Sequence, residues 1–414
     1  MIFIYNLSIK VVSGLFVLAS LFNSKAKLFV KGRKGLLFKI REDLKHNTDP
    51  VLWIHCASLG EFEQGRPVIE AFKKDFPAYR VLLTFFSPSG YEVRKKYALA
   101  DWVYYLPWDT KSNARQFVNA VKPALAIFVK YEFWFHYSNE LHKRSIPLLS
   151  IASIFRKDQL FFKSYGSFYR GILKKFSYFF VQNYISQDLL KNIGLTNISV
   201  AGDTRFDRVH AVANASEPLP IVLNFKNDTK LMVVGSAWPE DMEVLSPFIN
   251  EQGSKLKFII APHEIDEASL QLIESQTLQK NIRYSQASSA DLQQYQVLII
   301  DNIGLLSRLY KYGEFAFVGG AYGKGLHNIL EAACYGIPIF FGNKNFEKFQ
   351  EAKDLINRGG AFDIADYSDL LTKYEMVNFP ENFMLACEVT KSYVLENLGA
   401  TEKIMKYCHS ILKA

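Results

Sequence analysis

Short runs of apolar residues alternate with longer amphipathic stretches along most of this 414-residue chain. Runs of this kind are typical of buried parallel strands, and the stretches between them have the three- and four-residue spacing of helices. The runs fall into two sets, Val51–His55, Arg80–Phe85, Leu125–Val129, Pro147–Ser150, Tyr178–Val181 and Ile198–Ala201, then Leu231–Val234, Phe258–Ile260, Val297–Ile300, Phe315–Val318 and Ile337–Phe341. The pattern predicts an α/β protein with two parallel sheets, each covered by helices on both faces.

A polar stretch separates the two sets. Residues 211–228 include Pro218 and Pro220, which indicates a linker. We therefore expect an N-terminal domain over residues 36–212 and a C-terminal domain over residues 213–395, facing a cleft at the carboxyl ends of both sheets. The closing segment from about Cys387 reads as helix, and residues 396–414 are expected to pack back on the N-terminal domain.

The first 35 residues have a different composition. The first 22 are apolar except for a few residues such as Asn6 and Lys10, and a basic cluster follows at Lys25, Lys27, Lys31, Arg33 and Lys34. The apolar stretch is long enough to reach across a bilayer, but Lys10 favours a helix lying in the interface. The basic cluster would then face anionic headgroups on the cytoplasmic side. A signal peptide is disfavoured because the charges follow the apolar stretch; a buried first helix stays open as an alternative.

Composition indicates which kinds of partner and cofactor the protein is expected to bind. The formal net charge of +8 favours an anionic partner, such as phosphorylated substrates, acidic lipids or nucleic acid. The four cysteines form no CxxC pair, and the eight histidines form no HExxH cluster. We therefore expect a reduced compartment and neither a metal site nor a bound cofactor.

Residues 315–342 contain the most informative pattern. An apolar run ends at Gly319 and Gly320, a loop with Lys324 follows, and a helix is expected from about Asn328 to Tyr335. Such a turn directs backbone N–H groups and a helix N-terminus toward one point, which suits phosphate. The alternative is a plain capping box between Asn328 and Glu331.

Two carboxylates follow strands of the N-terminal half. Glu61 lies on the predicted loop after Val51–His55, before a helix expected to open near Arg66–Pro67, and Glu132 follows Leu125–Val129. Both are expected at the carboxyl edge of one sheet. Glu61 there could act as a general base, or it could simply be an acid interacting with a helix dipole.

Four further segments bring polar groups to expected sheet edges or to the surface. Arg205 is expected to project from a loop as an anion clamp or a plain surface charge. Gly235 and Ser236 precede a helix opened by Pro239, and His263 follows Phe258–Ile260. Arg156 belongs to the basic, aromatic segment 155–176, which suits lipid phosphates and a membrane surface but equally an ordinary amphipathic helix. Polar loops from both halves predict a cleft enzyme acting on a phosphorylated donor.

Taken together, six motifs resemble those of the 3-deoxy-D-manno-octulosonic acid (Kdo) transferases: SLGE (58–61), YEFW (131–134), AGDTRFD (201–207), GSAWPEDME (235–243), PH (262–263) and VGGAYGKGLHNILEAACYGIPIFFG (318–342). The resemblance covers nearly the whole chain. It implies a GT-B fold with two Rossmann-like domains and an N-terminal membrane anchor. It also implies an inverting, metal-independent transfer of Kdo from CMP-Kdo to the lipid A precursor in lipopolysaccharide biosynthesis, on the cytoplasmic face of the inner membrane.

The resemblance also assigns residues. Glu61 is matched to the proposed base, and acceptor binding or support falls to Ser58, Gly60, Glu132 and Arg156. Lys130 stands where the family has another acid, and Arg205 stands where it has a lysine. Donor binding is expected from Arg205, Gly235, Ser236, His263, Gly319, Gly320, Lys324, His327, Asn328 and Glu331. The family's arginine beside His263 has no clear counterpart, which leaves Lys324 as a substitute.

Three alternatives remain open at this point. One is a GT-B transferase that uses a UDP-sugar, and a second is an enzyme like UDP-N-acetylglucosamine 2-epimerase on the same fold. The third is a non-catalytic sugar or nucleic-acid binding module, although no nucleic-acid motif is present and no nucleic-acid partner is expected.

Overall fold

The computed structural model describes residues 1–215, 217–289 and 291–412. The chain divides into two compact units, one formed by Met1–Asp207 with Leu398–Ala414 and the other by Arg208–Asn397. The division after residue 207 lies five residues before the expected boundary at 212/213. The expected linker is largely helical, because α10 (Thr204–Ala215) and α11 (Pro220–Lys226) occupy most of it.

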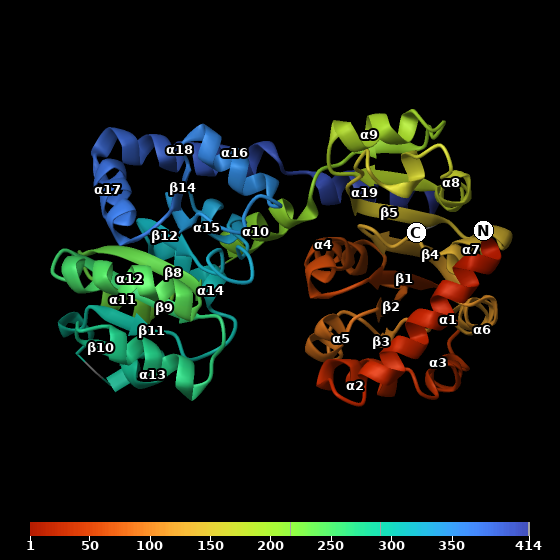
Figure 1. The fold of residues 1–414 in the computed structure, drawn as a ribbon, viewed down its shortest axis with the longest axis horizontal. Helices are drawn as coiled ribbons and strands as arrows, with labels where there is room; N and C mark the ends of the chain where they lie inside the picture. The colour runs from red at the N-terminus through yellow and green to blue at the C-terminus, as the bar shows by residue number, and fades with distance from the viewer. Residues whose placement is uncertain (216, 290, 413–414) are drawn as a thin grey trace. The chain divides into compact units, whose positions relative to one another are not determined.

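The first unit is built on a parallel seven-stranded sheet in the order β3-β2-β1-β4-β5-β6-β7 (Figure 1). Its strands are β1 (Val51–Cys56), β2 (Arg80–Phe85), β3 (Trp102–Tyr105), β4 (Pro123–Val129), β5 (Leu148–Ser153), β6 (Tyr178–Val181) and β7 (Ile198–Val200). The sequence pattern did not predict β3, a short strand at the sheet edge. The order reverses between β1 and β4, and ligands of such sheets bind outside the carboxyl ends at this point.

Helices cover both faces of this sheet. They are α2 (Ser24–Lys31), α3 (Leu36–Leu44), α4 (Leu59–Asp75), α5 (Pro88–Arg94), α6 (Lys111–Val121), α7 (Phe135–Lys143), η1 (Leu160–Phe162), α8 (Ser167–Leu173), α9 (Tyr184–Lys191) and α19 (Ala400–Ile411). Because successive strand residues point to opposite faces, β1 supplies both cores. Val51 and Trp53 pack with residues of α3 and α6, while Leu52, Ile54 and Cys56 pack with residues of α4 and α19.

The C-terminal helix α19 thus completes the first unit's core. Ile404 and Cys408 are buried among residues of β1 and α4. Asp207 caps this helix from a distance, since its carboxylate accepts hydrogen bonds from the N–H groups of Gly399 (2.7 Å) and Thr401 (2.6 Å). The single expected closing helix is two helices, α18 (Pro380–Glu396) and α19, separated at Gly399, whose φ of 98° breaks the helix.

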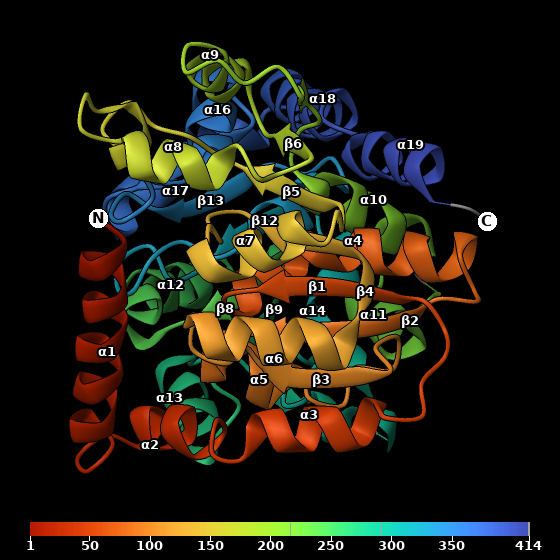
Figure 2. The same cartoon turned by 90° about the vertical axis from the view of Figure 1, so that its right-hand side faces the viewer.

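The N-terminal helix α1 (Ile2–Ala19) lies along the flank of the first unit, from the level of α8 to α2 (Figure 2). One side of it is docked. The Tyr5 hydroxyl donates to Asp109, Asn6 contacts His136 at 2.7 Å, and the Phe16 ring stacks on Phe29 at 4.1 Å. Most of its other apolar residues are exposed. Among the described residues it is the helix long and apolar enough to cross a membrane, with a mean hydropathy of 1.9.

The structure does not place Arg33 in the solvent-facing basic cluster that the sequence predicted. Its guanidinium donates to the backbone oxygens of Leu106, Phe29 and Phe86 and lies 3.7 Å from the centre of the Phe29 ring. Three carbonyls and several rings satisfy this cation inside the unit, and burial lowers its pKa to about 9. Lys25, Lys27, Lys31 and Lys34 are exposed.

The second unit repeats the architecture with a parallel sheet in the order β10-β11-β9-β8-β12-β13-β14 (Figure 1). Its strands are β8 (Lys230–Ala237), β9 (Leu256–Pro262), β10 (Asn281–Arg283), β11 (Val297–Ile299), β12 (Phe315–Val318), β13 (Ile339–Gly342) and β14 (Ala361–Ile364). The short strands β10 and β14 were not predicted. The order reverses between β8 and β12.

The helices of the second unit, besides α10, α11 and α18, are α12 (Pro239–Gln252), α13 (Glu267–Gln276), η2 (Tyr284–Ser289), η3 (Leu292–Gln294), α14 (Leu306–Leu309), η4 (Tyr310–Tyr312), α15 (Leu330–Ala333), α16 (Gln350–Arg358) and α17 (Tyr367–Asn378). Residues of α12 and α17 pack on β8, β9 and β12 in one buried apolar cluster. Pro239 opens α12 as predicted, which suits proline because the first helical N–H needs no partner.

Candidate active site

The predicted site residues gather at the two points where strand order reverses. In the first unit, Glu61 follows β1 and Glu132 follows β4; in the second, Ser236 is the last residue but one of β8 and Gly319 follows β12. Lys130 and Ser236 have left-handed φ angles of 67° and 54° at these strand ends. Non-glycine residues adopt this conformation at a cost, and such residues cluster at functional sites.

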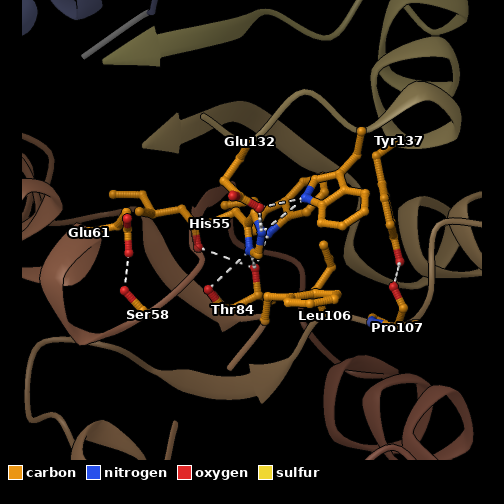
Figure 3. A network of polar contacts seen from close by, with 12 residues as sticks. His55, Ser58, Glu61, Thr84, Leu106, Pro107, Glu132 and Tyr137 are labelled. Carbon is orange, nitrogen blue, oxygen red and sulfur yellow. Dashed lines mark hydrogen bonds and ion pairs between the residues drawn. The ribbon is translucent and has the colours of Figure 1, made fainter. Parts of the chain in front are cut away.

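Glu61 lies in the first turn of α4, not on a loop. The helix begins at Leu59, so Pro67 is inside it and the expected opening near Arg66–Pro67 is wrong. Ser58 occupies the N-cap position, and its hydroxyl donates to Glu61 Oε2 (Figure 3). Gly60 beside them is exposed. The half-buried carboxylate is thus held through one of its two oxygens.

Glu132 is tied into a buried polar network under the sheet edge (Figure 3). Its Oε2 lies 2.9 Å from His55 Nε2 and accepts a hydrogen bond from Trp134 Nε1 at 2.7 Å. On the other side of the imidazole, His55 Nδ1 lies 2.9 Å from Thr84 Oγ1.

One set of proton positions satisfies this network. Trp53 Nε1 donates to Thr84 Oγ1 at 2.8 Å, the threonine hydroxyl donates to His55 Nδ1, and His55 Nε2–H donates to the carboxylate. Each group then has a partner, which buried polar groups require. His55 is fully buried while the Glu132 side chain is 11% exposed, so the network orients a carboxylate that reaches the surface.

Tyr131 precedes Glu132 in the chain and is contacted by Arg156. The exposed Arg156 donates from Nη2 to the Tyr131 hydroxyl at 2.9 Å, with its guanidinium 5.6 Å from the ring centre. Segment 155–176 is not one amphipathic helix, because it contains the short η1 and α8 joined by turns. The Arg156 cation is therefore held at Tyr131, one residue before Glu132.

Arg205 does not project from a loop. It lies in the first turn of α10, and its guanidinium pairs with Asp203 at 2.9 Å. The buried Asp203 also accepts from Gln64 (3.0 Å) and Gln182 (3.1 Å). Burial raises the pKa of Asp203, but the Arg205 charge and these hydrogen bonds outweigh it, so the pKa is lowered. Arg205 thus supports a buried carboxylate in the first unit.

The backbone amides of the glycine-rich segment were expected to bind phosphate, but they form hydrogen bonds within the second unit. Gly319 and Gly320 donate their N–H groups to Gly235 O (2.9 Å) and Asp241 Oδ2 (2.8 Å), and the amides of Gly323, Gly325 and His327 also have partners within the unit. A Cβ on Gly319 would lie 2.4 Å from Ser236 O, so glycine permits close packing of two strand ends. These five amides serve the fold, and a phosphate cradle formed from them is excluded in this conformation.

The helix after this loop is shorter than predicted. It covers only Leu330–Ala333, and Asn328 bonds to Glu331 Oε1 and to the Leu330 N–H, both at 3.3 Å. The local turn therefore satisfies Asn328, and four residues give too small a dipole for the expected site at the helix N-terminus.

An aromatic and cationic group lies at the carboxyl ends of β8 and β9. Trp238 stacks on His263 at 4.1 Å, Lys324 Nζ lies 4.2 Å from the Trp238 ring centre, and Trp238 Nε1 donates to His327 Nε2 at 3.0 Å. Burial, with a contribution from His263, lowers the pKa of His327 to about 4. Burial also lowers the pKa of His263. Lys324 is therefore the cation of this group at neutral pH, and both imidazoles are neutral.

Sequence reasoning missed His55, Trp238 and Asp241 as site-forming residues. His55 had a usable signal, since a histidine within an otherwise apolar buried strand needs polar partners. Asp241 is fully buried and accepts from the N–H groups of Trp238 and Gly320, and burial raises its pKa to about 6. Trp238 is only three residues away, but Gly320 is 79 positions along the chain, so no local pattern indicated that Asp241 joins the two segments.

Within residues 1–215, 217–289 and 291–412, no three His, Cys, Asp or Glu side chains are grouped so that they could hold a metal ion.

Comparisons with known proteins agree with the motif resemblance. Residues 31–208 match the family described as 3-deoxy-D-manno-octulosonic-acid transferase (kdotransferase). A 3-deoxy-D-manno-octulosonic acid transferase of Chlamydophila psittaci is 29% identical, with 80% of this chain and 79% of the relative covered. One from Aquifex aeolicus is 28% identical, with coverage of 80% and 87%.

Solved structures confirm the fold class. UDP-GlcNAc 2-epimerase from Neisseria meningitidis matches with a TM-score of 0.60 at 13% identity, covering 86% of this chain and 98% of that one. Acinetobacter baumannii MurG matches with a TM-score of 0.52 at 12% identity, covering 87% of this chain and 99% of that one. At these identities the similarity concerns the GT-B architecture alone.

Proposed function

We propose, from the match of residues 31–208 to the Kdo transferase family, that this protein transfers Kdo from CMP-Kdo to the lipid A precursor in lipopolysaccharide synthesis. The observation that carries the proposal is the pair of carboxylates Glu61 and Glu132, at the carboxyl ends of the adjacent strands β1 and β4 of that family domain. The similarity to Kdo transferases over four fifths of the chain supports the same reaction.

In the proposed reaction Glu61 is the general base. It removes the proton from an acceptor hydroxyl, whose oxygen attacks the anomeric carbon of Kdo as the bond to the CMP phosphate oxygen breaks. The Ser58 hydroxyl fixes one carboxylate oxygen, so the other can take the proton. Glu132, held by His55 and Trp134, orients the acceptor through a hydrogen bond.

The second unit is proposed to bind the donor. Trp238 offers a flat face, and Lys324 supplies the positive charge for the leaving phosphate. His327 accepts from Trp238 at Nε2, so its Nδ1–H is a neutral donor. We propose that these groups suffice without a metal, so that activity persists in excess EDTA.

For the location, we propose the cytoplasmic face of the inner membrane. The exposed apolar side of α1 and the exposed lysines of α2 and its flanks support it, because apolar contact and attraction to anionic lipids together hold a helix in the interface.

The direct test is incubation of the purified chain with CMP-Kdo and a tetraacylated lipid A precursor, followed by mass analysis of the product. A gain of one or more Kdo masses is expected. UDP-N-acetylglucosamine, with and without the same acceptor, is the matched control for the UDP-sugar transferase and the 2-epimerase alternatives. Turnover of UDP-N-acetylglucosamine without any turnover of CMP-Kdo would overturn the proposal.

A further inference from the structure

A cavity of about 530 Å³ lies beside Glu132 in the first unit. Its wall is mostly aromatic and aliphatic, with Tyr5 on α1, Phe133 and Trp134 after β4, Leu160 and Phe161 on η1, and Tyr169 on α8; the polar residues Asp158 and Gln159 before η1 also line it. Its size falls within the range of roughly 300–1,000 Å³ that is typical of small-molecule sites.

The wall is held by ring packing. The Phe133 ring lies 5.5 Å from Phe155 and 5.3 Å from Phe161, and Tyr5 packs against Phe135 and Phe168. Such contacts keep the apolar surface formed in the absence of a ligand. A sugar ring would find few hydrogen-bond partners along this wall, whereas a hydrocarbon chain needs none.

Besides Asp158 and Gln159, the cavity has polar groups at the carboxyl end of β4. Glu132 lines it, with its carboxylate oriented by His55 and Trp134, and the Tyr131–Arg156 pair lies next to it. A ligand with an apolar tail and an anionic, hydroxyl-bearing head matches this distribution.

The apolar side opens toward the surface that α1 shares. Leu160 is 43% exposed although it lines the cavity, and Tyr5 belongs to the helix whose outer side carries exposed apolar residues. A chain leaving a membrane at this surface could enter the cavity with little apolar area passing through water.

We propose that this cavity binds one fatty acyl chain of the glycolipid acceptor and thereby fixes the headgroup at the edge that carries Glu61 and Glu132. The inference rests on the proposed function, because it takes a lipid acceptor as given. It adds that acyl recognition takes place inside the protein, so acceptor affinity depends on the cavity as well as on the membrane.

The first test is photocrosslinking of the full chain with an acceptor analogue that carries a diazirine in one acyl chain. Crosslinks are expected in peptides that contain residues 131–134 and 158–161, and excess unlabelled acceptor should suppress them while excess phospholipid should not. Crosslinks confined to the exposed side of α1, or suppressed equally by phospholipid, would overturn the inference.

The second test fills the cavity mouth with Leu160→Trp. The KM for the tetraacylated acceptor should rise about tenfold, because a few methylenes lose their pocket, while turnover of a deacylated, water-soluble acceptor stays unchanged. Ile185→Trp, at an exposed apolar position on α9 outside the cavity, is the matched control.

The two proposals fail in distinguishable ways. If the unsubstituted protein transfers Kdo to neither acceptor, the proposed function is wrong. If it transfers Kdo, but Leu160→Trp leaves the KM values for both acceptors unchanged or changes them equally, the acyl site is wrong and the proposed function stands.

Discussion

At the scale of the residue, Glu61, the proposed base, differs from its neighbour Glu63 in its partners. Both lie near the start of α4, but Glu63 is paired with Arg94 at 2.9 Å, whereas Glu61 is held by the Ser58 hydroxyl. Glu61→Gln keeps the shape and loses the base, so kcat should fall by about 10²–10⁴ with CMP binding intact. Steady-state kinetics with calorimetric CMP titration measure this.

Glu63→Gln is the matched control and should keep nearly full turnover. Equal turnover by the Glu61→Gln enzyme would remove this residue as the base.

His327 allows a prediction about acid stability. Its folded-state pKa of about 4 lies below the ordinary value of 6.5. Between these two pH values the unfolded chain binds a proton at this residue that the folded chain does not bind. The stabilisation is therefore present above pH 6.5 and is lost as pH falls toward 4. His327→Gln should reduce this acid-dependent loss of unfolding free energy by about 1–2 kcal/mol, allowing for partial exposure.

Urea unfolding of both proteins between pH 7 and pH 4 measures the difference, with substitution of the exposed His46 as control. Parallel curves for the two proteins would contradict the burial of His327.

At the scale of the element, α19 depends on a cap from the far side of the chain. Asp207 accepts from the N–H groups of Gly399 and Thr401, which no residue preceding the helix does through its side chain. Asp207→Ala should destabilise the first unit by about 1 kcal/mol and speed amide exchange in residues 400–411. Asp207→Asn keeps an acceptor, so its stability should lie between those of the original protein and Asp207→Ala. Exchange rates of Asp207→Ala equal to those of the original protein would contradict the cap.

The helix α1 can be tested without undocking it. Phe3, Val11 and Leu18 are exposed, whereas Tyr5, Asn6 and Phe16 hold the helix to the unit. The triple substitution of the exposed residues by glutamate should move the protein from membrane pellets to the soluble fraction while its thermal midpoint stays unchanged.

Deleting residues 1–22 is a less specific test, because it also removes the Tyr5 partner of the buried Asp109. Persistent pelleting of the triple variant would shift the membrane contact to segment 155–176.

At the scale of the whole molecule, the division into two units predicts where each substrate acts. CMP should protect amides near Gly235–Trp238 and residues 319–328, all in Arg208–Asn397, and a soluble acceptor analogue should protect residues 58–66 and 130–134 in the first unit. Hydrogen exchange of the full chain with each ligand measures this. Protection by CMP that is confined to residues 58–66 would reverse the assignment of donor and acceptor.

Much of this architecture follows from local pattern. The strands Arg80–Phe85, Tyr178–Val181 and Phe315–Val318 have the predicted bounds, because an apolar run buried on both faces is visible in sequence. The short strands β3, β10 and β14 were not predicted, because edge strands of three or four residues have little hydrophobic pattern. The early start of α4 was missed because Pro67 reads as a first-turn residue, although the helix tolerates it inside.

The sequence by itself determined the fold class, the sheet edge at which Glu61 and Glu132 lie, and the resemblance to Kdo transferases, since these follow from periodicity, parallel topology and ordered motifs. Only the tertiary structure decided which polar groups remain for a ligand. Arg33 turned inward to carbonyls, the Gly319 and Gly320 amides found partners in Gly235 and Asp241, and His55 came to hold Glu132. Hydrogen bonds join groups that are adjacent in space, and packing brings together residues as far apart in the chain as His55 and Glu132, 77 positions, only once the sheets have formed.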